Sequence, residues 1–167
     1  MKTETRLKVE DAQTQLDIAA RFPDDELIVR SCINGFVSLA RSITFAMQAE
    51  SGNETPLAVW YRDQMAQQVT SEGPLLKFFN DMRVYSVHRG TVVLEQKSYA
   101  IFDTMRGDDG SAIFARQTGK EWLFDNSFSL GDRQYLPALA LCGVYLATIE
   151  RLVTQWEAQR SLLGLDV

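Results

Sequence analysis

The stretch DELIVRSCINGFVSLARSITFAMQAE, residues 25–50, decides the fold of this chain. Its apolar residues recur at three- and four-residue intervals, which gives one apolar stripe along a helix. The stripe consists of Ile28, Cys32, Phe36, Leu39, Ile43 and Met47. Acidic residues at 24–26 complement the helix dipole, and Ser51-Gly52-Asn53 favours a stop. We therefore predict a core-facing helix from about residue 25 to about residue 50.

Further helices are expected on both sides of this one. A short amphipathic segment covers residues 12–21, and Thr55 followed by Pro56 is typical of an N-cap and a first helical turn. That second long helix is predicted to continue to residues 71–73. A third begins at Pro74 and stops at Gly90, because glycine tolerates the left-handed conformation that closes many helices.

The pattern changes to extended structure from residue 91 to about residue 128. Short strands are predicted at 91–94, 98–102, 113–115 and 121–124, with a turn at 106–110. Gly131-Asp132 then leads into an apolar helix that ends near Arg160. Its predicted core positions are Leu136, Leu139, Gly143, Leu146, Ile149, Leu152, Val153 and Trp156. The predicted fold is mainly α, a helical bundle with a small β-rich or irregular insertion before the last helix, in one domain over residues 1–167.

Composition restricts the classes of function. A chain of 167 residues with 46% hydrophobic residues is long enough to bury one substantial core. The formal net charge of −5 argues against broad nonspecific binding to nucleic acid or to an anionic membrane. Cys32 and Cys142 lack metal-ligand spacing and are predicted to be buried reduced thiols, so no zinc site is expected. The chain also lacks a glycine-rich phosphate loop and a calcium loop, and no metal and no cofactor is expected.

The location of the chain is predicted from its charged start and its longest weakly polar run. The first ten residues resemble neither a secretory signal nor a membrane anchor, and the run at 135–149 is shorter than a bilayer requires. We therefore expect a cytoplasmic protein with no membrane partner.

The chemistry-bearing residues gather in LLKFFNDMRVYSVHRG, residues 75–90, which holds the single histidine of the chain, His88. An imidazole is the side chain best suited to moving a proton near neutral pH. Lys77, Arg83 and Arg89 outnumber the one acidic residue of the segment, Asp81. This local positive bias within an acidic protein is compatible with a phosphate site.

The spacing of Arg83 and His88, with four residues between them, resembles the signature of the HEPN superfamily. The resemblance implies a helical bundle and a metal-independent endoribonuclease that works as a homodimer, with Arg83 and His88 as its catalytic pair at a cleft between protomers. It also implies a setting in bacterial defence or a toxin–antitoxin pair, with RNA as substrate and a protein antitoxin or scaffold as partner. Other members of the family are noncatalytic bundles that bind partners.

Each residue of the segment has a chemical role in this hypothesis. Arg83 suits the phosphate through its planar fork of donors, and His88 serves as base or acid. One imidazole does not easily do both, so cleavage requires a dimer that pools two copies. Asn80 and Asp81 orient these groups, and Tyr85 stacks on a base. The alternative is that Asn80 and Asp81 are solvated, Tyr85 is half-buried in the bundle and His88 caps a helix.

Helical geometry separates the proposed catalytic pair. Five residues at 100° each place Arg83 and His88 about 140° apart around an ideal helix. The two converge if the last turn is distorted, if the arginine reaches around, or if a second protomer completes the site. The alternative functions are a noncatalytic interaction module and a small-ligand sensor that binds a nucleotide in the bundle.

Overall fold

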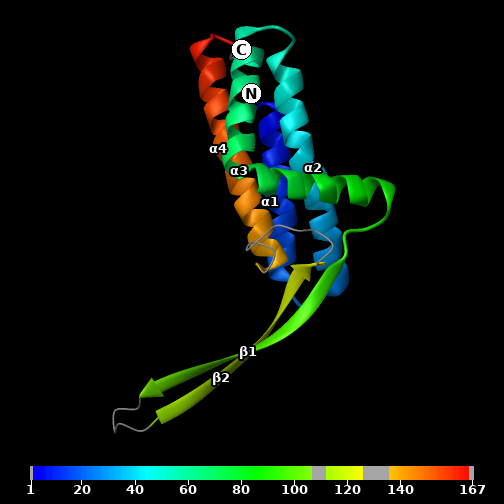
Figure 1. Cartoon of the computed structure of the whole chain (residues 1–167), viewed down its shortest axis with the longest axis vertical. Coiled ribbons are helices and arrows are strands. Elements are labelled where there is room, and N and C mark those ends of the chain that lie inside the picture. Colours follow the sequence, from blue (N-terminus) through cyan, green and yellow to red (C-terminus); the bar gives the residue numbers. More distant parts are fainter. Residues whose placement is uncertain (1, 107–111, 126–135, 166–167) are drawn as a thin grey trace.

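The computed structural model describes residues 2–106, 112–125 and 136–165. Within these residues the elements are α1 (Glu4–Arg21), α2 (Glu26–Ser51), α3 (Pro56–His88), β1 (Leu94–Arg106), β2 (Ala112–Phe124) and α4 (Ala138–Leu162). Helices α1, α2, the first part of α3 and α4 form the body, and the two strands extend from one end of it (Figure 1). The prediction of a mainly helical fold with a small β insertion before the last helix is confirmed.

Helix α2 lies at the centre of the bundle, in contact with α1, α3 and α4. The Asp25 side chain accepts a hydrogen bond from the backbone N–H of Ile28 at 3.0 Å, and Gly52 closes the helix with a φ of 72°. Most of the predicted stripe is buried, although Ile28 and Leu39 are only half-buried. The buried face is wider than one stripe because α2 packs against helices on several sides.

Helix α1 begins earlier than predicted, at Glu4 rather than near residue 12. Thr3 caps it, and the Glu50 carboxylate of α2 accepts hydrogen bonds from the backbone N–H groups of Glu4 and Thr5 at 3.1 Å and 3.2 Å. Arg6 forms an ion pair with Glu157 of α4. These contacts join residues far apart in the sequence, which explains why the local pattern did not predict the first two turns.

Helix α3 contains the two helices predicted over residues 55–90, joined across a kink. The kink lies at Glu72, whose φ of −123° and ψ of 19° are not helical. The nearby Pro74 has no backbone N–H to donate, which favours a bend at this point. Residues 73–88, hereafter the crossing segment, run across the bundle rather than along it (Figure 1). The segment ends as predicted, with His88 in its last turn and Gly90 at a φ of 136°.

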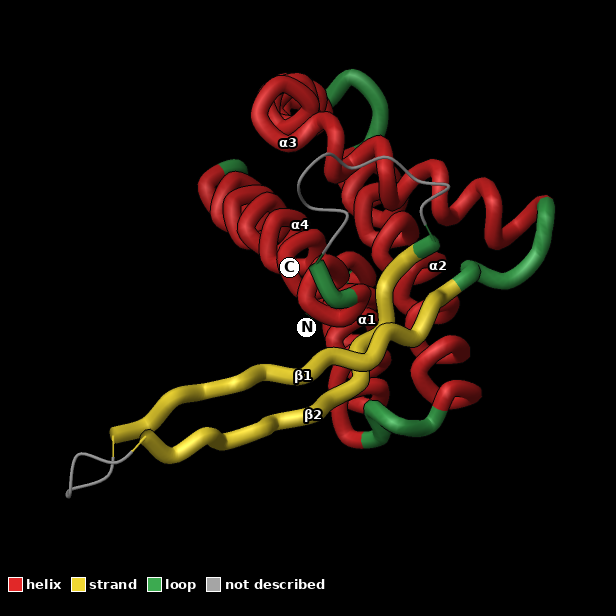
Figure 2. Tube along the Cα trace, turned by 60° about the horizontal axis from the view of Figure 1, so that its bottom comes forward, coloured by secondary structure: helices red, strands yellow, loops and turns green. Residues whose placement is uncertain are grey.

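The insertion is one antiparallel hairpin, with paired residues from Leu94↔Phe124 to Arg106↔Ala112. Each strand has 13 residues, so the predicted short strands were wrong in length. The backbone of the hairpin leads away from the bundle (Figure 2). Its base is fixed by Trp122, whose Nε1 donates to the backbone oxygen of Pro23 at 2.8 Å. Of the predicted turn at 106–110, Arg106 is the last residue of β1, and residues 107–110 lie outside the described residues.

Helix α4 confirms the predicted C-terminal helix, with Leu146, Ile149, Leu152, Val153 and Trp156 buried. Leu136 was wrongly placed in the core: it precedes the helix and is 38% exposed. The predicted helix start at Gly131-Asp132 lies outside the described residues. Both cysteines are buried and free, as predicted. Among the described helices, none is long and apolar enough to cross a membrane.

Asn34 of α2 connects the crossing segment to the hairpin. Its Oδ1 accepts from Ser86 Oγ at 3.2 Å and from the backbone N–H of Val92 at 2.8 Å, and its Nδ2 donates to the backbone oxygen of Arg30 at 2.9 Å. Val92 itself is buried. One amide therefore satisfies backbone groups at the point where α3 ends and the hairpin begins.

We expect Asn34→Ala to lower the free energy of unfolding by about 1–3 kcal/mol, because it leaves the buried N–H of Val92 without a partner. Urea unfolding followed by circular dichroism measures this loss. Asn53→Ala is the matched control, since Asn53 is exposed in the α2–α3 turn. Equal stability of the two variants would contradict the structural role of Asn34.

Candidate functional site

The crossing segment and Arg89, which directly follows it, carry every residue that the sequence singled out for chemistry. Its inner face is apolar, with Leu75, Phe78, Phe79 and Met82 buried. These positions follow the three- and four-residue spacing of one helix face. Aromatic contacts hold that face on the bundle. Phe79 stacks on Tyr145 of α4 with 4.2 Å between the ring centroids, and Phe78 packs against Phe124 of β2 with 5.2 Å between the centroids. The face that packs inward therefore fixes where the polar residues lie.

Arg83 lies at the side of this segment and is half-buried. Its guanidinium carbon is 5.6 Å from the ring centroid of Phe45, a residue of α2 that is 46% exposed. No ion pair of Arg83 exists within the described residues. The contact fixes the direction of the guanidinium group and leaves its N–H donors available.

Arg41 of α2 approaches the same ring, with its guanidinium carbon 4.5 Å from the Phe45 centroid. Its Nη1 donates to Thr44 Oγ1 at 3.0 Å, whereas its Nε is buried and has no hydrogen-bond partner within the described residues. Sequence reasoning missed Arg41 and Phe45 as site residues. The available signal was that Arg41 is the one charged residue between Arg30 and Glu50, in an otherwise uncharged and largely apolar run.

The charge of Arg41 acts on two buried tyrosines. Burial raises the pKa of Tyr145 to about 12 and also raises the pKa of Tyr61, while the positive charge of Arg41 lowers both. The two tyrosines come from α4 and from the first part of α3. Arg41 therefore sits where α2 and α3 meet α4, close to groups that are withdrawn from water.

A separate surface is formed by outward residues of the crossing segment and by Arg89. Asp81, Val84, Tyr85 and Arg89 line a hollow of about 240 Å³. Asp81 forms an ion pair with Lys77, so these two predicted binding residues contact each other. His88 and Arg89 are exposed at the end of the helix, whereas Asn80 and Tyr85 are half-buried.

The structure does not bring Arg83 and His88 together by bending the helix. Glu72 is the one residue within α3 whose backbone is not helical, so the turns that carry both residues are regular. They leave the helix about 140° apart. Arg83 is directed to Phe45 of α2, and His88 is exposed at the end of the segment. Arg83 and His88 could approach each other in three ways, and distortion of the last turn of the helix, one of the three, is absent.

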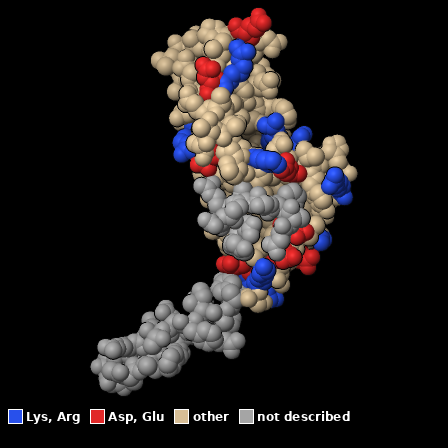
Figure 3. Space-filling model, in the orientation of Figure 1, with Lys and Arg blue, Asp and Glu red and all other residues tan. Residues whose placement is uncertain are grey.

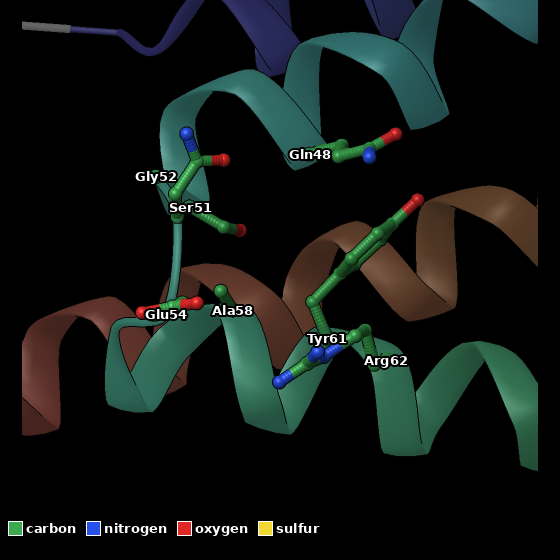
Figure 4. A pocket seen from close by; sticks show the side chains of 8 residues that line it. Gln48, Ser51, Gly52, Glu54, Ala58, Tyr61 and Arg62 are labelled. Atoms are coloured by element: carbon green, nitrogen blue, oxygen red, sulfur yellow. The ribbon is translucent and has the colours of Figure 1, made fainter.

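A separate polar pocket of about 400 Å³ lies at the turn between α2 and α3 (Figure 4). Tyr61 rises from α3 toward α2 in this view, and its hydroxyl donates to the backbone oxygen of Thr44 at 3.0 Å. Ser51 Oγ, also at the pocket, donates to the backbone oxygen of Met47 and accepts from Trp156 Nε1. The hydroxyl groups of Tyr61 and Ser51 therefore already have hydrogen-bond partners within the fold. The lining residues are Gln48, Ser51, Gly52, Asn53, Glu54, Ala58, Tyr61 and Arg62.

Comparison of the chain with protein-family models, with curated proteins and with solved structures finds no match.

The buried Tyr145 predicts a pH dependence of stability. Its folded pKa of about 12 lies above the ordinary value of 10, so the stability contributed by the neutral hydroxyl is complete below pH 10 and is lost as the pH approaches 12. Tyr145→Phe keeps the ring that stacks on Phe79 and removes the ionisable group. Between pH 10 and 12 the wild-type free energy of unfolding should fall by roughly 2–3 kcal/mol more than that of the variant. Denaturant unfolding at each pH measures the difference, and identical curves would refute it.

Proposed function

We propose that this chain is a metal-independent endoribonuclease that acts as a homodimer, in a setting of bacterial defence or a toxin–antitoxin pair. His88 transfers the proton, and Arg83 binds the phosphate. The observation that carries the proposal is the exposure of the single imidazole at the end of a helix, beside the exposed Arg89. His88 is exposed and takes part in none of the ion pairs among the described residues, so it is accessible to a substrate.

The chemistry of RNA cleavage fits these groups. Activation of a ribose 2′-hydroxyl requires a base, the leaving oxygen requires an acid, and the phosphorane-like transition state requires positive charge. Arg83 keeps its N–H donors available because it contacts an aromatic ring rather than a carboxylate. The acid and the base are the two copies of His88 in the dimer.

The divergence of Arg83 and His88 around the helix supports the dimeric arrangement. Within one chain the regular helix keeps the two about 140° apart. A second protomer that packs against the end of the crossing segment supplies the missing group to each imidazole. Lys77 and Tyr85 of the same segment, with Arg89 directly after it, are proposed to contact RNA. Asn80 and Asp81 are proposed to orient the catalytic groups.

A noncatalytic nucleotide-binding module is the second candidate. The observation that favours it is that Arg83 is directed toward Arg41 and Phe45 rather than toward His88. Such a module binds RNA or a nucleotide through the arginines and does not depend on the imidazole. Dependence of cleavage on His88 separates the two candidates.

We expect the wild-type chain to cleave labelled RNA in the presence of a metal chelator, and His88→Ala to lower the rate by about 10²- to 10⁴-fold, the usual contribution of a proton-transfer group. Gel analysis of a mixed-sequence RNA measures the rate. Val87→Ala is the matched control, because Val87 is the exposed neighbour of His88. Unchanged cleavage by folded His88→Ala would contradict the proposed role, and absence of wild-type cleavage would favour the binding module.

The requirement for two imidazoles predicts that cleavage depends on protein concentration. The rate per chain should fall on dilution over the same range in which the particle mass falls toward the 18.9 kDa of one chain. Sedimentation velocity and single-turnover cleavage on the same samples compare the two. Full activity of the monomer would refute a shared site.

A further inference from the structure

The arginine pair around Phe45, Arg41 and Arg83, is created by the tertiary fold. Arg41 and Phe45 are four residues apart on α2 and therefore neighbours on one helix face. Arg83 reaches the same ring from the crossing segment of α3. Two guanidinium groups therefore lie near one ring, with their carbons 4.5 Å and 5.6 Å from its centroid, and no sequence pattern places them there together.

Neither arginine is neutralised within the described residues. The ion pairs found there use Lys2, Arg6, Lys8, Arg30 and Lys77 as their cations. Arg41 donates from Nη1 to Thr44, and its buried Nε has no partner. An arginine has five N–H donors and stays protonated in proteins, so this pair holds two persistent charges with most of their donors unused.

The position of Arg41 strengthens its interaction with an anion. Burial raises the pKa of Tyr61 and of Tyr145, and the positive charge of Arg41 lowers the pKa of both. The guanidinium group is thus close to desolvated surroundings, where the effective dielectric is lower and charge interactions are stronger than in water. In these surroundings the positive charge of Arg83 repels that of Arg41, and a bound anion offsets the repulsion.

The chemistry of two arginines favours a phosphate group over a carboxylate. The two oxygens of a carboxylate lie in one plane and match one guanidinium fork. The oxygens of a phosphate group point in several directions, so one group can accept hydrogen bonds from arginines on two different helices. Figure 3 shows basic side chains at the level of the crossing segment, interrupted by acidic ones, within a chain whose net charge is −5.

We propose that Arg41 and Arg83, oriented by the ring of Phe45, form a binding site for one phosphate group of a single-stranded RNA or of a nucleotide. The choice of RNA as the polymer rests on the proposed function, whereas the phosphate chemistry does not. Arg41 becomes a substrate-binding residue on α2, a helix outside the segment that carries His88. Phe45 is a positioning residue, because its ring directs both guanidinium groups.

The test measures binding separately from cleavage. A fluorescein-labelled oligouridylate is titrated in chelator against the His88→Ala chain, and against the same chain carrying Arg41→Gln, Arg83→Gln or both. Each single change should weaken binding by roughly tenfold to a hundredfold, the range for charge-assisted hydrogen bonds. Arg151→Gln is the control, since it removes the same charge from an exposed position of α4 and should change binding by about twofold or less.

Further measurements identify the source of the phosphate. Inorganic phosphate and adenosine monophosphate are tested by thermal shift at constant ionic strength. Stabilisation of the wild type and not of Arg83→Gln assigns the site to a free phosphate or a nucleotide. Binding of the oligonucleotide alone through the pair assigns it to an RNA backbone, and each lost contact then lowers the salt slope by about 0.7.

The inference is overturned if none of these probes binds, if folded Arg41→Gln and Arg83→Gln bind like the control, or if polyglutamate competes as well as RNA. If Arg41→Gln does not fold by circular dichroism, Arg83→Gln and Arg83→Lys decide the outcome. Loss of cleavage with retained, pair-dependent phosphate binding refutes the ribonuclease and leaves the site in place. Cleavage that needs His88 but neither arginine refutes the site alone.

Discussion

The packing of Phe79 is the interaction on which the remaining structure depends. Its ring contacts Phe36 of α2, Phe124 of β2 and Tyr145 of α4, so one side chain of the crossing segment joins three other elements. Edge-to-face and stacked aromatic contacts contribute beyond the area that they bury. The bend at Glu72 and Pro74 is what brings the segment across the bundle to make them. The hairpin base and the polar face of α3 take their positions from this contact.

This packing separates the functional groups of the crossing segment into two sets. Because the apolar face is held inward, Arg83 meets α2 and His88 remains exposed at the end. An active monomer would need these groups to converge, and the regular helix keeps them apart. The proposed site shared by two protomers and the proposed phosphate-binding bundle are both compatible with this geometry, and they differ in the role of the imidazole.

The charge near Phe45 is positive although the net charge of the chain is negative. The chain is acidic overall, yet Arg41 and Arg83 converge on one ring without a carboxylate within the described residues. Cation–π contacts orient guanidinium groups at little cost to their donors. The ion pair between Lys77 and Asp81 shows the opposite case, in which two residues predicted to bind a substrate contact each other. An arginine that contacts a ring keeps its charge available to an anion, whereas a lysine in an ion pair already has its charge balanced.

The sequence by itself determined the extent of α2, the start of α3 at Thr55-Pro56, the buried cysteines and the β insertion. Propensity and capping act over a few neighbouring residues, so a local pattern records them. It also indicated the segment that holds His88. Only the tertiary structure decided that α1 starts at Glu4 under the Glu50 carboxylate, and that Arg41 and Arg83 meet at Phe45. These contacts join residues some forty positions apart, and their geometry is set by how whole helices pack, which no local pattern records.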